Sequence, residues 1–320
     1  MYDEEMLSAA PLFSILGLPV TGFALFVAVG ALLALGMALL RARKTGVESN
    51  TVLWFAMLGI PLGLLCARLV FCLFNFSDVQ YNGFWYIFRL DYGGFTVIGA
   101  FLGLLLAGVL TRLITGCSFL DLMDAVVPGL LILLALERFG EGATDNGVGL
   151  EVSAAGLRFF PLARPGVYED MYLYAVHMFE GMTALVAGVY TQSMPKAPRG
   201  RAAGTGIILA CAGQIVWESI RKDSRLMFDL ASLLMIFCAI VLFALLLLCL
   251  WRLDWPLGGK ALAVAGFLAL AVITGALQFF MEGKFVQSIP VWLCFALSCL
   301  STAGLAWLNL RVLRSATEQP

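Results

Sequence analysis

Charge is scarce in this sequence. Asp, Glu, Lys and Arg make up 13% of its 320 residues, whereas 61% are hydrophobic and the mean hydropathy is +0.94. A soluble protein cannot cover so large an apolar fraction with so few polar residues. The alternation of polar and apolar residues that marks a transmembrane β-barrel is also absent. The composition therefore predicts an integral membrane protein built from helices.

Other features that the sequence lacks exclude a cleaved signal peptide and a zinc site. The N-terminus, MYDEEMLSAAPLF, lacks the basic region of a cleavable signal peptide, so the first apolar run is expected to remain as a helix. The eight cysteines form no CxxC pair and no spacing to histidine that suits zinc, so they are interpreted as small buried hydrophobes. No zinc site is therefore expected, and a net charge of −1 gives no sign of a nucleic-acid partner.

Long apolar runs are what the sequence does contain. About 20 apolar residues cross a bilayer core of about 30 Å as a helix. Runs of this length cover 18–41, 52–75, 93–116, 119–137, 172–192, 203–221, 227–251, 259–281 and 287–311. The predicted fold is all-α, a polytopic transmembrane bundle. Turn residues in WPLGGK divide it into a seven-helix domain, 1–251, and an additional two-helix C-terminal segment, 252–320.

The basic residues predict the orientation of the bundle. Basic residues follow the first, third, fifth and last spans, and these ends are expected to face the cytoplasm. They are Arg41, Arg43, Lys44, Arg112, Lys196, Arg199, Arg201, Arg311 and Arg314. Nine crossings then leave the N-terminus outside and the C-terminus in the cytoplasm. Residues 138–171 become a small extracytoplasmic head, and long structured connections of this kind tend to carry function.

Charged residues beside the apolar spans need an explanation, because each costs about 2.5–3.5 kcal/mol at mid-membrane on insertion scales. They are Arg68 in CARLVFCLFN, Arg138 after the fourth span, His177 and Glu180 in YAVHMFEGM, and Glu218 and Arg221 in QIVWESIRKD. Taken singly, each is also explained as a structural ion pair or as an anchor at the membrane interface. Together they are expected to converge on one pocket at the outer leaflet, where arginines hold a lipid phosphate by bidentate hydrogen bonds.

Individual roles follow from residue type. Glu218 and Arg221 are i,i+3 neighbours and can pair. Glu141 is a candidate general base, although a solvated loop carboxylate is the alternative. His177 is a second candidate, although a lone histidine in a membrane helix is also explained as a satisfied core residue.

The glycines of GGFTVIGAFLG permit two interpretations. Gly93, Gly94 and Gly99 allow a lipid headgroup to approach the backbone. Close packing of helices explains them equally well.

Five stretches, in this order, resemble the prolipoprotein diacylglyceryl transferase family of bacterial inner membranes. The family has a G-A-R-L-Y-Y-V-I-F-N helix, a G-G-L-x-x-[HY]-G-G-L-x-G segment and a long pattern ending in G-R-x-G-N-F-x-N-x-E-x-x-G, followed by F-L-Y-E and R-F-x-I-E-x-L-R-x-D. The matching stretches are CARLVFCLFN (66–75), GGFTVIGAFLG (93–103), VPGLLILLALERFGEGATDNGVG (127–149), HMFEG (177–181) and QIVWESIRKD (214–223). From Pro128 through Arg138 to Gly149 the spacing matches without a gap.

The resemblance implies transfer of a diacylglyceryl group from phosphatidylglycerol to the lipobox cysteine thiol of a preprolipoprotein, at the outer face of the bacterial cytoplasmic membrane. Its implied partners are phosphatidylglycerol, preprolipoprotein signal segments and membrane lipids, and no cofactor is needed. The attacking cysteine belongs to the substrate. The expectation from the residues and the family together is that Arg138 and Arg221 hold the phosphate, Glu218 orients Arg221, and Glu141 is the base with His177 in reserve. The other predicted binding residues are Arg68, Gly93, Gly94, Gly99, Gly140, Gly149 and Glu180.

The chain also departs from the family pattern. Ile98 stands where the pattern has His or Tyr, and Gln214 replaces the first arginine of R-F-x-I-E-x-L-R. The N-F-x-N-x-E portion becomes Glu141, Gly142, Thr144 and Asn146. The alternative function is therefore a catalytically degenerate relative that binds phospholipid or lipoprotein signal segments without transfer. A small-molecule transporter is a third reading, against which the lack of an inverted repeat counts.

Overall fold

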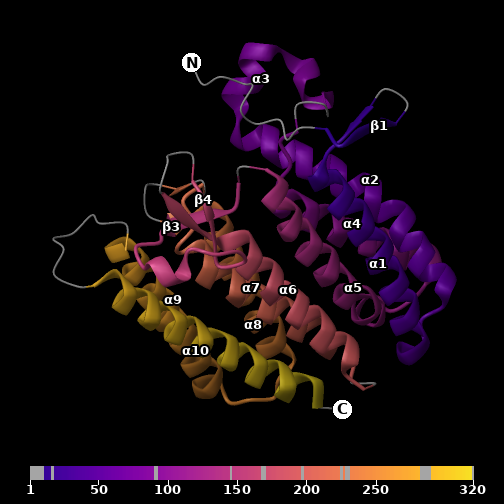
Figure 1. The fold of residues 1–320 in the computed structure, drawn as a ribbon. Coiled ribbons are helices and arrows are strands. Elements are labelled where there is room, and N and C mark those ends of the chain that lie inside the picture. The colour runs from indigo at the N-terminus through magenta and orange to yellow at the C-terminus, as the bar shows by residue number, and fades with distance from the viewer. Residues whose placement is uncertain are drawn as a thin grey trace. The chain divides into compact units, whose positions relative to one another are not determined.

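The computed structural model describes residues 11–15, 18–89, 93–144, 146–166, 171–195, 198–223, 226–227, 231–281 and 290–318. Its α-helices are α1 (Gly22–Thr45), α2 (Ser49–Phe74), α3 (Phe76–Asn82), α4 (Val97–Thr115), α5 (Phe119–Gly140), α6 (Val176–Ser193), α7 (Arg201–Glu218), α8 (Leu233–Arg252), α9 (Leu257–Met281) and α10 (Val291–Glu318) (Figure 1). Each of the nine predicted apolar runs therefore contains a helix, and the prediction of a polytopic helical bundle is confirmed.

The helices differ in how apolar they are. Seven are long and apolar enough to cross a membrane, namely α1, α2, α4, α5, α8, α9 and α10. The remaining two of the nine predicted spans, α6 and α7, have 18 residues each. Their hydropathy is lowered by polar residues that include His177 and Glu180 on α6 and Gln214 and Glu218 on α7. These two helices thus carry polar groups of the candidate site and are not among the seven that are long and apolar enough to cross a membrane.

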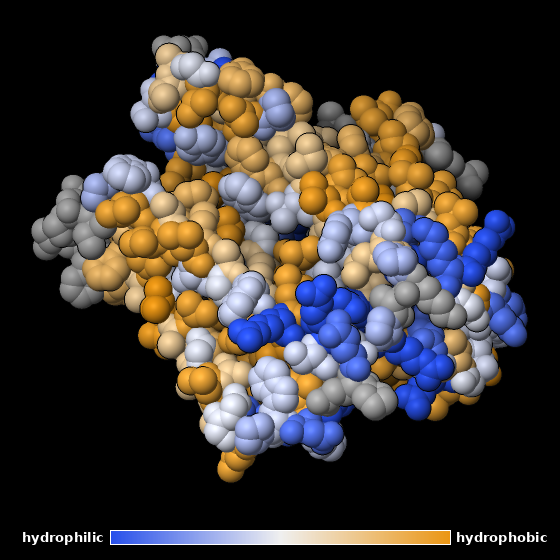
Figure 2. Space-filling view, turned by 90° about the horizontal axis from the view of Figure 1, so that it is seen from below, coloured by the Kyte–Doolittle hydropathy of each residue, from blue (hydrophilic) through white to orange (hydrophobic). Residues whose placement is uncertain are grey.

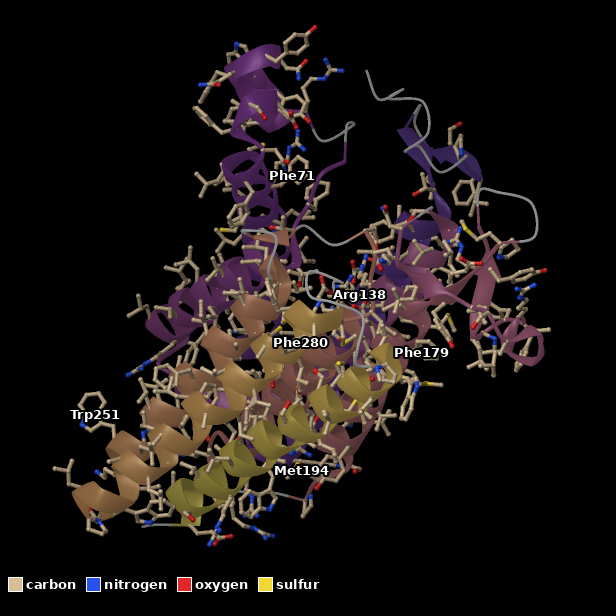
Figure 3. All side chains as sticks on the ribbon, turned by 90° about the vertical axis from the view of Figure 1, so that its left-hand side faces the viewer. Phe71, Arg138, Phe179, Met194, Trp251 and Phe280 are labelled. Atoms are coloured by element: carbon tan, nitrogen blue, oxygen red, sulfur yellow. The ribbon has the colours of Figure 1, made fainter. Side chains whose placement is uncertain are left out.

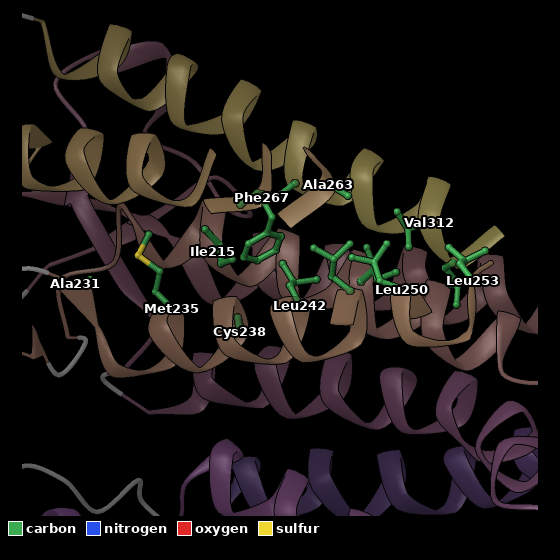
Figure 4. Packing of buried hydrophobic residues seen from close by; sticks show 14 residues of the cluster. Ile215, Ala231, Met235, Cys238, Leu242, Leu250, Leu253, Ala263, Phe267 and Val312 are labelled. Atoms are coloured by element: carbon green, nitrogen blue, oxygen red, sulfur yellow. The ribbon is translucent and has the colours of Figure 1, made fainter. Parts of the chain in front are cut away.

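The chain forms two compact units, one made of residues 1–36 and 127–320 and the other of residues 37–126. This division differs from the predicted boundary near residue 251, because α9 and α10 pack on α7 and α8 within the first unit. Figure 4 shows their shared core, in which Leu242 of α8 lies near Phe267 of α9, and Leu250 of α8 lies near Val312 of α10. Burial of these side chains makes the two C-terminal helices part of the first unit's core.

The first unit also contains short strands, which the prediction of an all-α fold did not include. An N-terminal hairpin joins β1 (Phe13–Ile15) to β2 (Leu18–Val20). In the predicted head, β3 (Val148–Glu151), β4 (Ala163–Pro165) and β5 (Tyr172–Ala175) form an antiparallel sheet in the order β3-β5-β4. Two 3₁₀ turns, η4 (Glu141–Ala143) and η5 (Ala155–Leu157), precede and follow β3. A two-stranded pair, β6 (Leu226–Met227) and β7 (Ala231–Ser232), comes before α8.

The second unit is organised by close packing of α2 on α4. Gly99 and Gly103 of α4 lie against the backbone of Cys66 and Leu62 of α2, where any Cβ would collide with a carbonyl. The small residues recur every fourth position, which lets two membrane helices approach closely. The 3₁₀ helix η2 (Phe84–Phe88) follows α3 in this unit.

The surface has the character expected of a membrane protein. Large apolar side chains are exposed on several helices, including Leu32 at 72%, Leu113 at 74% and Trp251 at 83%. Figure 2 shows broad apolar areas beside a polar region on one face of the molecule. Monomeric soluble proteins rarely expose so much apolar surface.

Candidate active site

The candidate site lies in the first unit, where one end of α5, α6 and α7 meets the small head. Arg138 is in the last turn of α5, His177 and Glu180 are near the start of α6, and Glu218 is the last residue of α7. Figure 3 shows Arg138 among nitrogen and oxygen atoms near one end of these helices. Three of the predicted helix ends are therefore brought together.

A short stretch of backbone pairing joins the head to the chain that follows α7. Gly149 and Arg221 form an antiparallel bridge. Two backbone hydrogen bonds, of 3.1 and 2.9 Å, connect residues 148–150 to residues 220–222. This pairing fixes the backbone of Arg221 beside β3, so that its side chain reaches Glu141 across 80 positions of sequence.

Arg221 contacts three carboxylates. Its Nε donates to Asp223 Oδ1 at 2.9 Å and its Nη2 donates to Asp223 Oδ2 at 3.0 Å. Its Nη1 donates to Glu180 Oε2 at 2.8 Å, and Nη2 lies 3.2 Å from Glu141 Oε2. A planar guanidinium with fixed donors suits this arrangement, because each edge of the group meets a different acid.

Arg138 completes the cluster from the opposite side of Glu141. Its Nη1 donates to Glu141 Oε1 at 2.6 Å. Its Nε lies 3.5 Å from both Glu137 Oε2 and Glu180 Oε2, and it makes no hydrogen bond with any described residue. Arg138 is buried, so this N–H is a donor held out of water and still open to an acceptor.

Gln214 has a role that the sequence analysis missed. Its Nε2 donates to Glu180 Oε1 and, at 3.0 Å, to Glu218 Oε2. The amide thus joins two carboxylates, at the position where the family pattern has an arginine. The i,i+4 spacing of Gln214 and Glu218 on one helix face was the signal available in the sequence.

Asp223 is a second residue that the predicted site did not include. Besides its two bonds from Arg221, Oδ2 accepts a hydrogen bond from Gly147 N–H at 2.8 Å. Burial acts to raise the pKa of Asp223, but the hydrogen bond and charge of Arg221, together with Gly147 N–H, hold that pKa below its usual value. The carboxylate therefore links the arginine to the loop before β3.

His177 lies beside the cluster and faces the same loop. Its Nδ1 is 3.0 Å from Gly147 O, and its backbone N–H also donates to that oxygen, at 3.1 Å. The ring is buried, with 2% of the residue exposed. His177 therefore has a fixed orientation close to the residues predicted to hold phosphate.

Aromatic residues form one wall next to Glu180 and Glu218. Trp217 stacks on Phe179, with ring centroids 4.9 Å apart, and its Nε1 donates to Thr183 Oγ1 at 2.7 Å. Phe295 of α10 lies on the same indole at 6.3 Å between centroids. Helix α10 therefore supports the residue that precedes Glu218.

Arg68 and two of the predicted glycines lie in the second unit and contact one another. Arg68 donates to Tyr86 O at 2.8 Å, to Ile87 O and Gly94 O at 3.2 Å, and also to Gly93 O. Gly93 and Gly94 have positive φ values of 64° and 72°, which favour glycine. These bonds give the three residues a structural role, and their predicted part in substrate binding stays a prediction.

Packing also explains the other predicted glycines. Gly99 lies against α2, next to the buried Ile98. In the first unit, a Cβ on Gly140 would lie 2.9 Å from Phe26 Cβ, and one on Gly149 would lie 2.6 Å from a methyl of Val176. Glycine is required at these places by close neighbours, whatever else these residues contact.

Arg138, Glu141, Glu180, Glu218 and Arg221 form one network with Gln214 and Asp223. Within the described part of the chain, no group of three or more His, Cys, Asp or Glu residues is arranged to hold a metal ion. The network contains two oriented guanidinium groups, a residue type that can bind an anion such as a phosphate. Such groups can also stabilise charge that develops on a departing phosphate.

Comparison with known proteins agrees with this geometry. The family model described as "Prolipoprotein diacylglyceryl transferase" matches residues 10–280. Three relatives are called phosphatidylglycerol–prolipoprotein diacylglyceryl transferase. The protein of Clostridioides difficile is 27% identical over 67% of this chain and 84% of its own length. That of Clostridium novyi is 26% identical over 72% and 93%, and that of Chloroflexus aggregans is 30% identical over 56% and 59%.

The match covers most of the sequence and includes every residue of the network. The match ends before α10, so the helix that packs on α7 lies outside the matched region. The substitutions at Ile98 and Gln214 fall inside the matched region and do not remove the likeness. The chain belongs to the prolipoprotein diacylglyceryl transferase family.

Proposed function

We propose that this protein transfers the diacylglyceryl group of phosphatidylglycerol to the lipobox cysteine thiol of preprolipoprotein signal segments. The reaction would take place at the outer face of the bacterial cytoplasmic membrane, with the N-terminus outside and the C-terminus in the cytoplasm. Family membership supports the reaction, as do the names of the relatives. The alternative of a relative that binds without transfer gains no support from these comparisons.

The observation that carries the proposal is the pair of guanidinium groups on either side of Glu141, whose side chains are 4% (Arg138) and 9% (Arg221) exposed. In the transfer, a sulfur–carbon bond forms, the bond between that carbon and the phosphate oxygen breaks, and glycerol phosphate leaves with the electron pair. Negative charge grows on the leaving phosphate, and fixed positive charge close to it lowers the barrier. Arg138 and Arg221 are the described residues whose burial and orientation suit this task.

The carboxylates hold the arginines in place before a lipid arrives. Arg221 is fixed by Asp223, Glu180 and Glu141, so its orientation does not need the substrate. The Nε of Arg138 makes no hydrogen bond with a described residue and is a natural donor to a phosphate oxygen. Preorganised donors of this kind cost little reorganisation during the reaction.

These contacts favour an orienting role for Glu141 over that of general base. Its carboxylate lies 2.6 Å from Arg138 Nη1 and 3.2 Å from Arg221 Nη2. The carboxylate is therefore engaged by both guanidinium groups and helps to hold them in place. Glu180 and Glu218 are similarly engaged by Gln214, so the proton of the substrate thiol needs another acceptor.

Complementation tests the proposal, combined with a direct assay. The gene would be expressed in a strain depleted of its own transferase, and membranes containing the protein would be mixed with phosphatidylglycerol and a lipobox peptide. We expect growth to be restored and the peptide to gain the mass of one diacylglyceryl group. Arg138→Gln should abolish both effects, whereas Arg314→Gln, a change at a side chain that is 70% exposed, should abolish neither.

Absence of both rescue and mass gain from a well-expressed wild-type protein would overturn the transferase assignment. Wild-type levels of transfer by Arg138→Gln would leave the reaction in place and remove the role given to that arginine.

A further inference from the structure

This inference rests on the proposed function and concerns the proton that the substrate thiol must lose. We propose that Nε2 of His177 accepts this proton, and that Gly142 is the position through which the thiol reaches it. A thiolate attacks far more readily than a thiol, whose pKa of about 8.5 leaves little of it ionised at neutral pH. A proton acceptor within reach of the sulfur is therefore part of the machinery that the reaction needs.

Hydrogen bonding fixes which nitrogen of His177 is basic. Nδ1 lies 3.0 Å from Gly147 O, and a carbonyl oxygen only accepts, so Nδ1 carries the hydrogen in the neutral ring. Nε2 then holds a lone pair, and it has no hydrogen bond to any described residue. The imidazole is thus presented as an acceptor.

The loop that orients the ring is itself fixed. Gly147 accepts from His177 through its carbonyl and donates through its N–H to Asp223 Oδ2 at 2.8 Å. Its φ of 77° and the 2.6 Å that would separate a Cβ from His177 Cβ leave room only for glycine. Through Asp223, the ring is connected to Arg221, one of the groups proposed to hold the phosphate.

Gly142 is what stands between Nε2 and the surface. A Cβ on residue 142 would lie 3.0 Å from His177 Nε2 and 3.5 Å from Cδ2. Gly142 is exposed, whereas the ring is buried. Because residue 142 has no side chain, the position beside Nε2 that its Cβ would take is left for an approaching thiol.

A catalytic role of His177 explains two departures from the family pattern together. The pattern has His or Tyr where this chain has Ile98, and it has Phe where this chain has Gly142. A phenylalanine at 142 would occupy the space now taken by the imidazole. The loss of a polar group at 98 is therefore accompanied by an imidazole at 177 and by removal of the side chain that would exclude it.

Charged groups of both signs act on the ring, and Glu141 is the one that favours the imidazolium. The groups that act on the imidazole are Glu141, Arg164 and Arg221. When Nε2 takes the thiol proton, the sulfur forms its bond to the lipid carbon and the carbon–oxygen bond breaks. The imidazolium then returns the proton to the leaving glycerol phosphate, and Glu141 is the carboxylate near enough to stabilise the positive ring in between.

His177→Asn is the sharpest test, because the asparagine amide can keep the hydrogen bond to Gly147 O while Nε2 is lost. The purified full-length variant and the wild type would be assayed with two lipobox peptides, one with cysteine and one with selenocysteine, whose selenol is already ionised at neutral pH. We expect kcat/KM of the variant to fall by about 10²–10⁴ with the cysteine peptide. With the selenocysteine peptide it should stay within about tenfold of the wild type, since no proton has to be removed.

Gly142→Ala tests the access route, with Gly156→Ala as its matched control. Gly142→Ala places a methyl against Nε2 and should lower kcat/KM with the cysteine peptide by more than tenfold. Gly156 has no neighbour within 4 Å of its would-be Cβ, so Gly156→Ala should have no effect. Thermal unfolding in detergent would show that each protein is folded.

An equal loss with both peptides would assign His177 a structural role and overturn this inference, as would a His177→Asn variant with wild-type kcat/KM. Either result, obtained with an active wild type, would leave the proposed transfer intact. A wild type that modifies neither peptide would overturn both proposals.

Discussion

Arg221→Lys keeps the positive charge but removes the planar group that contacts three carboxylates. The variant therefore measures what the shape of the guanidinium contributes to stability and to the rate of transfer. In the wild type, three nitrogens of Arg221 meet Asp223, Glu180 and Glu141. A single ammonium is a point charge and cannot keep the two-bond contact with Asp223 together with both other acids. At least two charge-assisted hydrogen bonds are expected to be lost.

Hydrogen bonds to charged groups contribute about 1.5–3 kcal/mol each, so two lost bonds lower the free energy of unfolding by about 3 kcal/mol at the lower end of that range. The rate should suffer separately, because removal of one well-placed donor to a developing anion costs about 10²–10³ in kcat. Transfer to a lipobox peptide, followed by mass spectrometry, measures the rate, and thermal unfolding in detergent measures stability. Arg314→Lys serves as the control at an exposed site. If Arg221→Lys matched the control in both measurements, the orientation of the guanidinium would be irrelevant and the reasoning would be refuted.

Three further changes test other parts of the structure. Asp223→Asn removes a carboxylate whose pKa is held low, and that contribution to stability is present above the unfolded pKa of about 3.9 and lost as pH falls through the folded value. The Tm difference between wild type and Asp223→Asn should therefore shrink between pH 7 and pH 3, and a constant difference would contradict this. Thr183→Val leaves Trp217 Nε1 without its acceptor, and should cost about 1 kcal/mol of stability and shift the tryptophan fluorescence. Gly99→Ala places a methyl against the α2 backbone and should lower Tm strongly, whereas Gly275→Ala, with open space around it, should not; similar Tm values would argue against tight α2–α4 packing.

The helices could be predicted from the sequence because lipid demands long apolar segments with internally paired backbones. The first four predicted spans start or end within a few residues of α1, α2, α4 and α5. The predicted span over 172–192 was less accurate, because its first residues form β5 of the head sheet and α6 begins only at Val176. The alternating periodicity of so short a strand is hidden when an apolar helix follows directly.

The site could be predicted in part, because unpaired charge near a bilayer is too costly to be accidental. This argument brought Arg138, Glu180 and Arg221 into one group, and the structure places their side chains in contact. It could not find Gln214, since an uncharged amide gives no such signal and its two carboxylate partners are known only once α6 lies beside α7.

Arg68 in the second unit shows a further limit of predicting a binding site from the sequence. Arg68 was predicted as a site residue by the same argument about charge. Its guanidinium donates instead to the backbone carbonyls of Tyr86, Ile87, Gly93 and Gly94. A sequence shows that a buried arginine needs acceptors, but it does not show whether they belong to a ligand or to the chain's own loop.

The two helices that carry most of the site, α6 and α7, have 18 residues each. At a rise of 1.5 Å per residue, each is about 27 Å long, slightly less than a hydrocarbon core of about 30 Å. Their neighbours α9 and α10, with 25 and 28 residues, exceed that thickness. Hydrophobic mismatch of this kind thins the bilayer locally around the shorter helices. Lipids with shorter acyl chains would relieve the mismatch. We therefore expect the acyl-chain length of the surrounding lipids to affect the depth in the membrane at which a headgroup meets Arg138 and Arg221.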